Sequence, residues 1–301
     1  MPSTNEAIQI GVVGLGKMGS AISDRLILSG QSVLGWDSSP AARSAFAAKG
    51  GTVATDLAEM RRASVVISVV WDDEATRAVA LGPDGLVSLL PKSATHLAMG
   101  TISPALSRIL DSAHRAKGQR YLAATMFGRP EAAAAGTVLI VCSGANDTYE
   151  SIKSVFDPMG TSRWIGDDPQ QANLVKLMGN NMIFVAIELL GEMFALLRKA
   201  GVSDQNVREL LVERLFPGPI FSGYAQRVID RRWSPPAGTI AALAHKDNKL
   251  CLEAAQLLGV DLPLVNLMRH QIDAAIQSGA GELDISAFAR ERLARSGFSD
   301  H

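Results

Sequence analysis

Cysteine is scarce in this sequence, and metal-ligand clusters and an excess of positive charge are missing. The only two cysteines, Cys142 and Cys251, lie far apart without CxxC spacing, which argues against a disulfide framework or a thiolate metal site. The five histidines also lack ligand spacing, so we expect no bound metal. Lysine and arginine total 29 against 30 acidic residues, and this balance lacks the basic excess of proteins that bind nucleic acids.

Long apolar runs and a leader segment are missing as well. The most apolar stretch, residues 182–197, contains Glu188 and Glu192 and is shorter than the roughly 20 apolar residues of a membrane span. Residues 1–6 have neither the basic nor the apolar region of a secretory signal. We therefore expect a cytoplasmic protein that does not interact with membranes.

The chain has the length and composition of a folded two-domain protein, with 301 residues, 47% hydrophobic and 20% charged. In its first half, short β-branched runs alternate with helical patterns such as 17–29 and 104–117, as in βαβ units. Several runs are apolar on both faces, which is typical of a parallel sheet covered by helices. The sequence thus predicts a Rossmann-like doubly wound α/β domain, with strands at 8–13, 32–36, 64–70, 95–98 and 137–142.

Strand signals stop after Trp164, and apolar residues then recur at helical spacing from Gln170 to Ala200. A helix of this length is roughly 45 Å long, more than a small domain spans, so we expect it to connect the two domains. We predict a dinucleotide-binding domain over 1–166 and an all-α domain for substrate binding and dimerisation over 167–301. Further helices are expected at 202–215, 239–258 and 262–278.

A glycine-rich loop follows the first predicted strand and opens a helix. Gly14 allows a tight turn, Gly16 admits a pyrophosphate to the backbone, and Gly19 permits close packing of the helix. The N–H groups at the start of the helix would then bind the phosphates. The alternative is a glycine turn without a ligand. The predicted cofactor loop is Gly14, Leu15, Gly16, Lys17, Met18 and Gly19.

An acidic residue, Asp37, ends the second predicted strand and is followed by Ser38. Its carboxylate is suited to accept hydrogen bonds from the ribose hydroxyls of the adenosine, which favours NAD over NADP. Val70 and Trp71 follow another strand at the sheet edge where doubly wound folds bind ligands, so we expect them to contact the cofactor.

Together with the glycine loop, four later segments resemble the 3-hydroxyisobutyrate dehydrogenase, or β-hydroxyacid dehydrogenase, family, which is related to imine reductases. The resemblance implies that Lys176, together with Asn180, is catalytic and that Lys246 reaches the nicotinamide. It also implies substrate binding by Thr101, Ser103, Gly128, Lys176 and Asn180, with Thr101 near the cofactor too. We expect Phe127 and Arg129, which differ from the family's residues in the same loop, to bind the substrate as well. The segments are Met99 to Pro104, Phe127 to Arg129 continuing to Thr137, Lys176 with Asn180, and Lys246 with Asp247.

Several positions depart from the family pattern. Ala98 and Gly100 replace its usual Asp and Ser, and Phe127 replaces a serine, so two hydroxyls that would bind a substrate carboxylate are missing. Gln170 and Ala172 replace two glycines before the long helix. Substrate identity therefore stays open.

The chemistry expected of Lys176 is proton transfer. Lys176 and Asn180 are four positions apart, so they share one face of the long helix. An ammonium stabilises and protonates the oxygen that becomes negative after hydride transfer, while the amide of Asn180 can orient either partner. The alternative is a solvated helix lysine, against which the flanking apolar residues argue.

Three functions remain open. The first is an NAD(P)-dependent dehydrogenase or reductase for a small β-hydroxy acid or its semialdehyde. The second is an imine reductase, and the third is a dinucleotide-binding protein without activity. Arg129 adds a guanidinium suited to an anionic substrate, with a surface arginine as the alternative. His245, beside Lys246, is interpreted as a packing residue, and a homo-oligomer through the helical domain is expected.

Overall fold

The computed structural model describes residues 9–234 and 239–298. The chain forms two compact units, Met1–Lys176 and Leu177–His301, and the division between them falls inside the helix α8 (Gln170–Lys199). The predicted helix from Gln170 is confirmed nearly to its last residue. The domain boundary after residue 166 stays a prediction.

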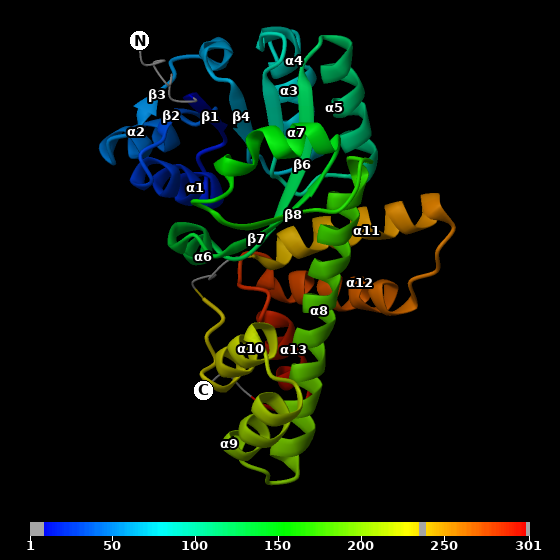
Figure 1. Cartoon of the computed structure of the whole chain (residues 1–301). Helices are drawn as coiled ribbons and strands as arrows, with labels where there is room; N and C mark the ends of the chain where they lie inside the picture. The colour runs from blue at the N-terminus through cyan, green and yellow to red at the C-terminus, as the bar shows by residue number, and fades with distance from the viewer. Residues whose placement is uncertain (1–8, 235–238, 299–301) are drawn as a thin grey trace. The chain divides into compact units, whose positions relative to one another are not determined.

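The first unit is built on one sheet with the strand order β3-β2-β1-β4-β5-β6-β7-β8 (Figure 1). Its neighbouring strands pair in parallel except β6 and β7, which are antiparallel, and the predicted Rossmann-like doubly wound sheet is confirmed. The strands are β1 Gln9–Val13, β2 Ser32–Trp36, β3 Thr52–Val53, β4 Val65–Ser68, β5 Thr95–Ala98, β6 Arg120–Phe127, β7 Val138–Ser143 and β8 Gly160–Trp164.

Helices cover both faces of this sheet, as the apolar strands predict. Ile10 and Val12 of β1 pack on the side of α1, whereas Val13 packs with Leu86 and Leu90 on the other side. The helical segments of this unit are α1 Lys17–Leu28, α2 Pro40–Ala48, η1 Leu57–Arg62, α3 Asp73–Leu81, α4 Leu86–Leu89, α5 Pro104–Ala116, α6 Pro130–Ala135, α7 Asn146–Ile152 and η2 Lys153–Val155.

The first turn of α8 is fixed to the sheet by buried hydrogen bonds. Thr125 Oγ1 in β6 donates to Ala172 O at 3.0 Å. Ser143 Oγ in β7 donates to Pro169 O and accepts from Ala172 N, both at 2.9 Å. These bonds set the position at which α8 leaves the sheet, and hence the position of Lys176 one turn later.

The second unit consists of helices around a core of its own. Phe184, Ile187 and Phe194 of α8 are fully buried there with Phe288. Apart from the bridge between Ile240 and Asp284, its described residues contain no β pairing. The helical segments after α8 are α9 Asp204–Val207, η3 Arg208–Leu215, α10 Pro219–Ile229, α11 Ala241–Leu258, α12 Pro263–Ala275, η4 Ile276–Ala280 and α13 Ala287–Arg295.

By length and composition α8 also qualifies as a membrane span, with a mean hydropathy of 1.5 over 18 residues of which 44% are buried. Core helices of soluble proteins pass the same test. In the second unit, one face of α8 is apolar because it packs into the hydrophobic core of that unit.

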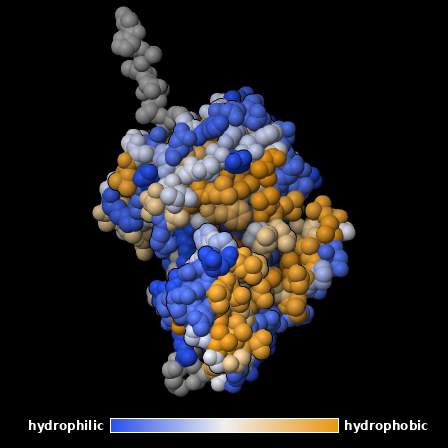
Figure 2. All heavy atoms as spheres, turned by 60° about the horizontal axis from the view of Figure 1, so that its bottom comes forward, coloured by the Kyte–Doolittle hydropathy of each residue, from blue (hydrophilic) through white to orange (hydrophobic). Residues whose placement is uncertain are grey.

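A second face of α8 exposes a stripe of apolar side chains. Met182, Leu189 and Leu196 are 64%, 53% and 71% exposed, and their seven-residue spacing places them on one side of the helix. The space-filling view shows how apolar side chains gather on one face of the molecule (Figure 2).

Candidate active site

The glycine loop between β1 and α1 has the close backbone packing that its sequence predicts. Gly14 has a φ of +96°, and a Cβ there would lie 2.2 Å from Val69 O. A Cβ at Gly19 would lie 1.8 Å from Gly14 O, so any side chain would push the helix away from the loop. A Cβ at Gly16 would meet no atom of the described chain within 4 Å, which leaves the approach to the start of α1 open.

Asp37 lies against this loop. One of its carboxylate oxygens accepts from Leu15 N at 2.7 Å, and the other accepts from Ser39 N at 2.8 Å. Each oxygen has a second lone pair, so the group can accept further hydrogen bonds. Arg43 was missed by the sequence analysis: its guanidinium donates to Asp37 O at 2.5 Å from the first turn of α2.

The segment after β5 lies beside the chain that leaves β4. A Cβ at Gly100 would lie 2.8 Å from Val70 O, which gives a steric reason for the departure from the family's serine. Trp71, the next residue, is 54% exposed. Thr101 is half-buried between Gly100 and Ile102, the latter packed in the core under α5.

The backbone N–H and the hydroxyl of Ser103 are both engaged in hydrogen bonds with nearby residues. Its N–H donates to Asp73 Oδ1 at 2.7 Å, its hydroxyl donates to the other oxygen of Asp73, and the same hydroxyl caps α5 by accepting from Leu106 N. Ser103 is therefore the N-cap of α5. The predicted use of Ser103 as a substrate donor competes with Asp73, a residue that the sequence analysis did not single out although it directly follows Trp71 and Asp72.

At the end of β6 the chain turns through Phe127, Gly128 and Arg129 into α6. Gly128 has a φ of +152°, and a Cβ there would lie 2.7 Å from a methyl group of Val138, so the turn requires glycine. Arg129 is half-buried at the N-cap position of α6. The turn therefore fixes the backbone from which Phe127 and Arg129 project.

Lys176 is half-buried in α8, and its Nζ lies 4.5 Å from the centroid of the Phe127 ring. This distance is within the range of a cation–π interaction. Both are predicted site residues, but their contact could not be predicted, because they are far apart in the chain and only the docking of α8 brings them together.

Asn180 and Lys246 meet at a buried carboxylate in the second unit. Asn180 Nδ2 donates to Asp247 Oδ2 at 2.7 Å, and Lys246 Nζ lies 3.2 Å from Asp247 Oδ1. Asp247 is 1% exposed, so its charge is balanced by Lys246 and its position fixes the amide of Asn180.

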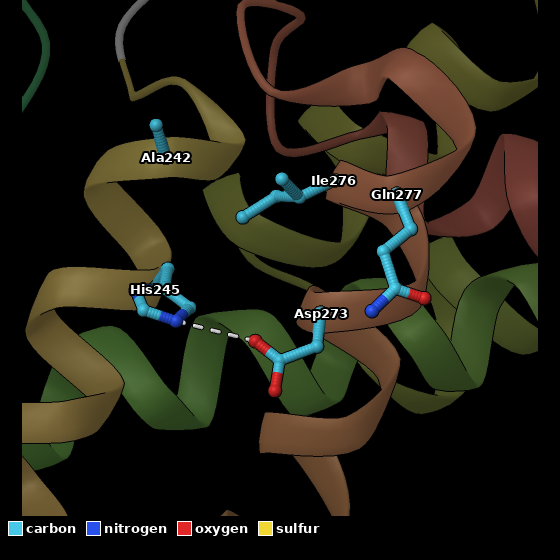
Figure 3. A pocket seen from close by; sticks show the side chains of 5 residues that line it. All are labelled: Ala242, His245, Asp273, Ile276 and Gln277. Atoms are coloured by element: carbon cyan, nitrogen blue, oxygen red, sulfur yellow. Dashed lines mark ion pairs between the residues drawn. The ribbon is translucent and has the colours of Figure 1, made fainter.

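A separate cavity of about 290 Å³ lies between α11 and η4 in the second unit (Figure 3). His245 Nε2 lies 3.2 Å from Asp273 Oδ1 across it, and Arg269 Nε binds the same carboxylate at 3.2 Å. Burial lowers the pKa of His245, and the charge of Arg269 lowers it further. His245 is thus a partly exposed residue beside the Asp273 carboxylate and not the packing residue expected. The other lining residues are Ala242, Ile276 and Gln277, and no predicted site residue is among those described there.

The described residues fit a dinucleotide better than a metal. They contain no group of three or more His, Cys, Asp or Glu side chains that could hold a metal ion. At α1, no described side chain caps the helix start, and Gly16 leaves the space above it open. Unpaired N–H groups at such a helix start are suited to a pyrophosphate.

Two family models match the chain consecutively. Residues 9–168 match the NAD binding domain of 6-phosphogluconate dehydrogenase, and residues 171–291 match the model described as NAD-binding of NADP-dependent 3-hydroxyisobutyrate dehydrogenase. The resemblance found in the motifs is therefore confirmed over both parts of the chain.

Individual proteins match over nearly the whole chain. Uncharacterized oxidoreductase YfjR of Bacillus subtilis is 30% identical over 285 residues, which cover 94% of this chain and 99% of that protein. The 3-hydroxyisobutyrate dehydrogenase of Salmonella typhimurium matches with a TM-score of 0.83 at 25% identity, covering 94% of this chain and 99% of that one. An imine reductase of Bacillus cereus, 17% identical with a TM-score of 0.62 and covering 94% and 98%, shares the fold. The chain belongs to the 3-hydroxyisobutyrate dehydrogenase-like family of NAD(P)-dependent oxidoreductases, which act on β-hydroxy acids.

Proposed function

We propose that the chain transfers a hydride between NAD(P) and a small β-hydroxy acid or its semialdehyde, with Lys176 as general acid and base. The observation that carries this proposal is the position of Lys176. Three buried hydrogen bonds fix the start of α8 to β6 and β7, and they place the ammonium at the end of β6 in the same unit as the glycine loop.

The residues that would bind the cofactor in the first unit follow the carboxyl ends of its strands. The loop Gly14–Gly19 would hold the pyrophosphate, Asp37 and Ser38 the ribose, and Val70, Trp71 and Thr101 the nicotinamide end. When bound, the nicotinamide supplies or accepts the hydride. Protein side chains would transfer the proton and orient the substrate.

In reduction, the Lys176 ammonium donates a proton to the substrate oxygen as negative charge develops there. In oxidation, the neutral amine accepts the hydroxyl proton. Asn180 adds a donor and an acceptor without charge one helical turn after Lys176, and Asp247 holds its amide at 2.7 Å. We assign Asn180 the role of orienting the substrate.

NAD is the preferred cofactor in this proposal. The Asp37 carboxylate is held by two backbone N–H groups with lone pairs left for ribose hydroxyls, and it would repel a 2′-phosphate. Arg43 and the hydroxyls of Ser38 and Ser39 would favour the phosphate, but the Arg43 guanidinium is engaged by Asp37 O.

The proposed substrate carries an anionic group bound by Arg129. A guanidinium pairs bidentately with a carboxylate, phosphate or sulfonate and stays charged at any working pH. The hydroxyl of Thr101 is a further proposed hydrogen-bond donor to the substrate, because Thr101 and Arg129 follow the carboxyl ends of the neighbouring parallel strands β5 and β6. Ser103 contributes less, because its hydroxyl proton is directed at Asp73.

Imine reduction is the second candidate function. It is favoured by Gly100 and Phe127, which lack the hydroxyls of the family pattern. The two functions are separated by following nicotinamide absorbance with NADH and NADPH against semialdehydes and a cyclic imine, and with NAD⁺ and NADP⁺ against 3-hydroxy acids. Turnover of an anionic semialdehyde or hydroxy acid supports the main proposal, and turnover of the imine alone overturns it.

We further propose a homo-oligomer formed through the helical unit. The stripe Met182, Leu189 and Leu196 exposes more apolar side chain than an isolated helix face of a soluble protein needs. The cytoplasmic location expected from the sequence remains part of this proposal.

A further inference from the structure

The contact between Lys176 and Phe127 is built into the docking of α8 on β6. Thr125 and Phe127 are two residues apart in a strand, so both side chains project from the same face about 6.6 Å apart. Ala172 and Lys176 are four residues apart in a helix, which is one turn and about 6 Å of rise. The two repeats match, and so the hydrogen bond from Thr125 to Ala172 O brings Lys176 onto the ring of Phe127.

The ring itself is held firmly. Phe127 packs against the buried cluster that contains Ile102, Leu106 and Ala172, and the backbone of β6 around it pairs with β7 from Ala123 to Phe127. Gly128 then fixes the direction in which the chain leaves the strand. A fixed ring presents one face to the ammonium, with Nζ 4.5 Å from the centroid.

An aromatic face discriminates between the two protonation states of a lysine. Its negative quadrupole attracts an ammonium and has little attraction for a neutral amine. An aliphatic side chain of similar size would desolvate the amine without that attraction, and desolvation favours the neutral form. The identity of residue 127 therefore influences which form of Lys176 predominates.

We propose that Phe127 is a positioning residue that keeps Lys176 as an ammonium at the end of β6 and thereby extends to higher pH the range in which Lys176 can protonate the substrate. The inference rests on the proposed role of Lys176. In reduction, an N–H bond of Lys176 breaks as the O–H bond of the product forms, and the resulting amine takes a proton from solvent; a bound reduced nicotinamide would supply the hydride to the carbonyl carbon. In oxidation the amine must form first, and the ring opposes it.

The first test measures the titration of Lys176 directly and needs no substrate. Lysines are reductively methylated with ¹³C, which preserves their charge, and the Lys176 signal is identified by its absence from Lys176→Arg. In Phe127→Leu we expect the midpoint of this titration to move to lower pH by about half to one pH unit. Phe127→Tyr keeps the ring and should titrate like the wild type.

Met126→Leu is the matched control, because Met126 is the neighbouring buried residue on the opposite face of β6. It should leave the titration unchanged. If Phe127→Leu fails to fold, Phe127→Met takes its place, since an unbranched side chain fills irregular space. A Lys176 titration in the non-aromatic variant that matches the wild type overturns the inference.

The second test uses the pH dependence of kcat/KM for reduction of succinic semialdehyde. The alkaline limb should move to lower pH in Phe127→Leu and stay in place in Phe127→Tyr. Loss of activity without movement of the limb would mean a structural role and would contradict the inference. The proposed role of Lys176 fails separately, if Lys176→Ala keeps its turnover.

Discussion

At the scale of single residues, a carboxylate and a guanidinium lie together where the ribose of a dinucleotide is expected. Asp37 was found from the sequence because it ends a β-branched run after a glycine loop, and such local spacing is visible in the chain. Arg43 was not found, because its contact with Asp37 O depends on the turn between β2 and α2. The contacts of Phe127 with Lys176 and of Asp73 with Ser103 were missed as well, because they too form only when distant parts of the chain pack together.

Asp37 leads to a prediction on cofactor choice. Wild type should bind NADH more tightly than NADPH, and Asp37→Ala should lose about tenfold or more of its NADH affinity, since hydrogen bonds to a charged group contribute about 1.5–3 kcal/mol. Arg43→Ala should weaken NADPH more than NADH. Fluorescence titration of both cofactors measures these constants, and a wild type that prefers NADPH would contradict the proposal.

Arg129 leads to a prediction on the substrate. Arg129→Ala should raise KM for an anionic substrate more than Arg129→Lys does, because lysine keeps the charge and loses the bidentate geometry. Neither change should alter cofactor affinity. Steady-state kinetics with the best substrate of the panel provides the measurement. An Arg129→Ala variant that turns over every substrate as well as wild type rules out the anion site.

At the scale of elements, the sequence predicted well where the apolar pattern was strong. The bounds of β2 and β5 agree with the predicted runs, and α8 begins at Gln170 as expected. The three missed strands have weaker signals: β3 has only two residues, β6 contains Ala123 and Ala124, which have low β propensity, and β8 is polar and only partly buried. The antiparallel pairing of β6 with β7 is a tertiary property that no periodicity reveals.

A buried chain of hydrogen bonds joins β4, β5 and α5. Ser68 Oγ lies 2.8 Å from His96 Nε2, His96 Nδ1 lies 2.8 Å from His114 Nε2, and His114 Nδ1 lies 2.7 Å from Gln119 Oε1. Since the Gln119 amide donates to Leu90 O, its oxygen accepts, which fixes both histidines as neutral tautomers. Burial lowers the pKa of His114 to about 4, and burial beside His114 lowers that of His96 well below its usual range.

The hydrogen bonds of these buried neutral histidines predict that the protein loses stability in mild acid. The unfolded state binds a proton at His114 near pH 6.5 and the folded state only near pH 4, so the free energy of unfolding should fall as pH decreases between these values. At pH 5 the loss due to His114 is roughly 2 kcal/mol. Urea unfolding at pH 7.5 and 5 should show a smaller difference for His114→Gln than for wild type. His270→Gln, at an exposed position, is the control, and an equal pH effect in wild type and His114→Gln would contradict the prediction.

At the scale of the whole molecule, the exposed stripe on α8 predicts an assembly. Wild type should be a homo-oligomer, and Leu189→Glu with Leu196→Glu should dissociate it, because two charges would be buried without partners. Leu28→Glu, at a leucine of α1 that is 77% exposed, should leave the assembly intact. Light scattering coupled to size-exclusion chromatography gives the masses. A monomeric wild type, or an unchanged mass in the double variant, contradicts the assignment.

The chemistry of the molecule depends on Lys176. Its position follows from the fixed start of α8, its Nζ lies over the aromatic ring of Phe127, and the unit that contains it also carries a glycine loop suited to a dinucleotide. Lys199 offers a matched control, because it lies on the same helix with its Nζ 4.9 Å from the centroid of the Phe298 ring and has no proposed role in the reaction.

The most direct test compares turnover and cofactor binding in Lys176→Ala. A positioned acid or base contributes about 10² to 10⁴ in rate, so kcat should fall by that factor while the dissociation constant of the cofactor stays within about threefold of wild type. Lys199→Ala should keep both values. A Lys176→Ala variant with kcat within about threefold of wild type would contradict the assignment of Lys176 as the general acid and base.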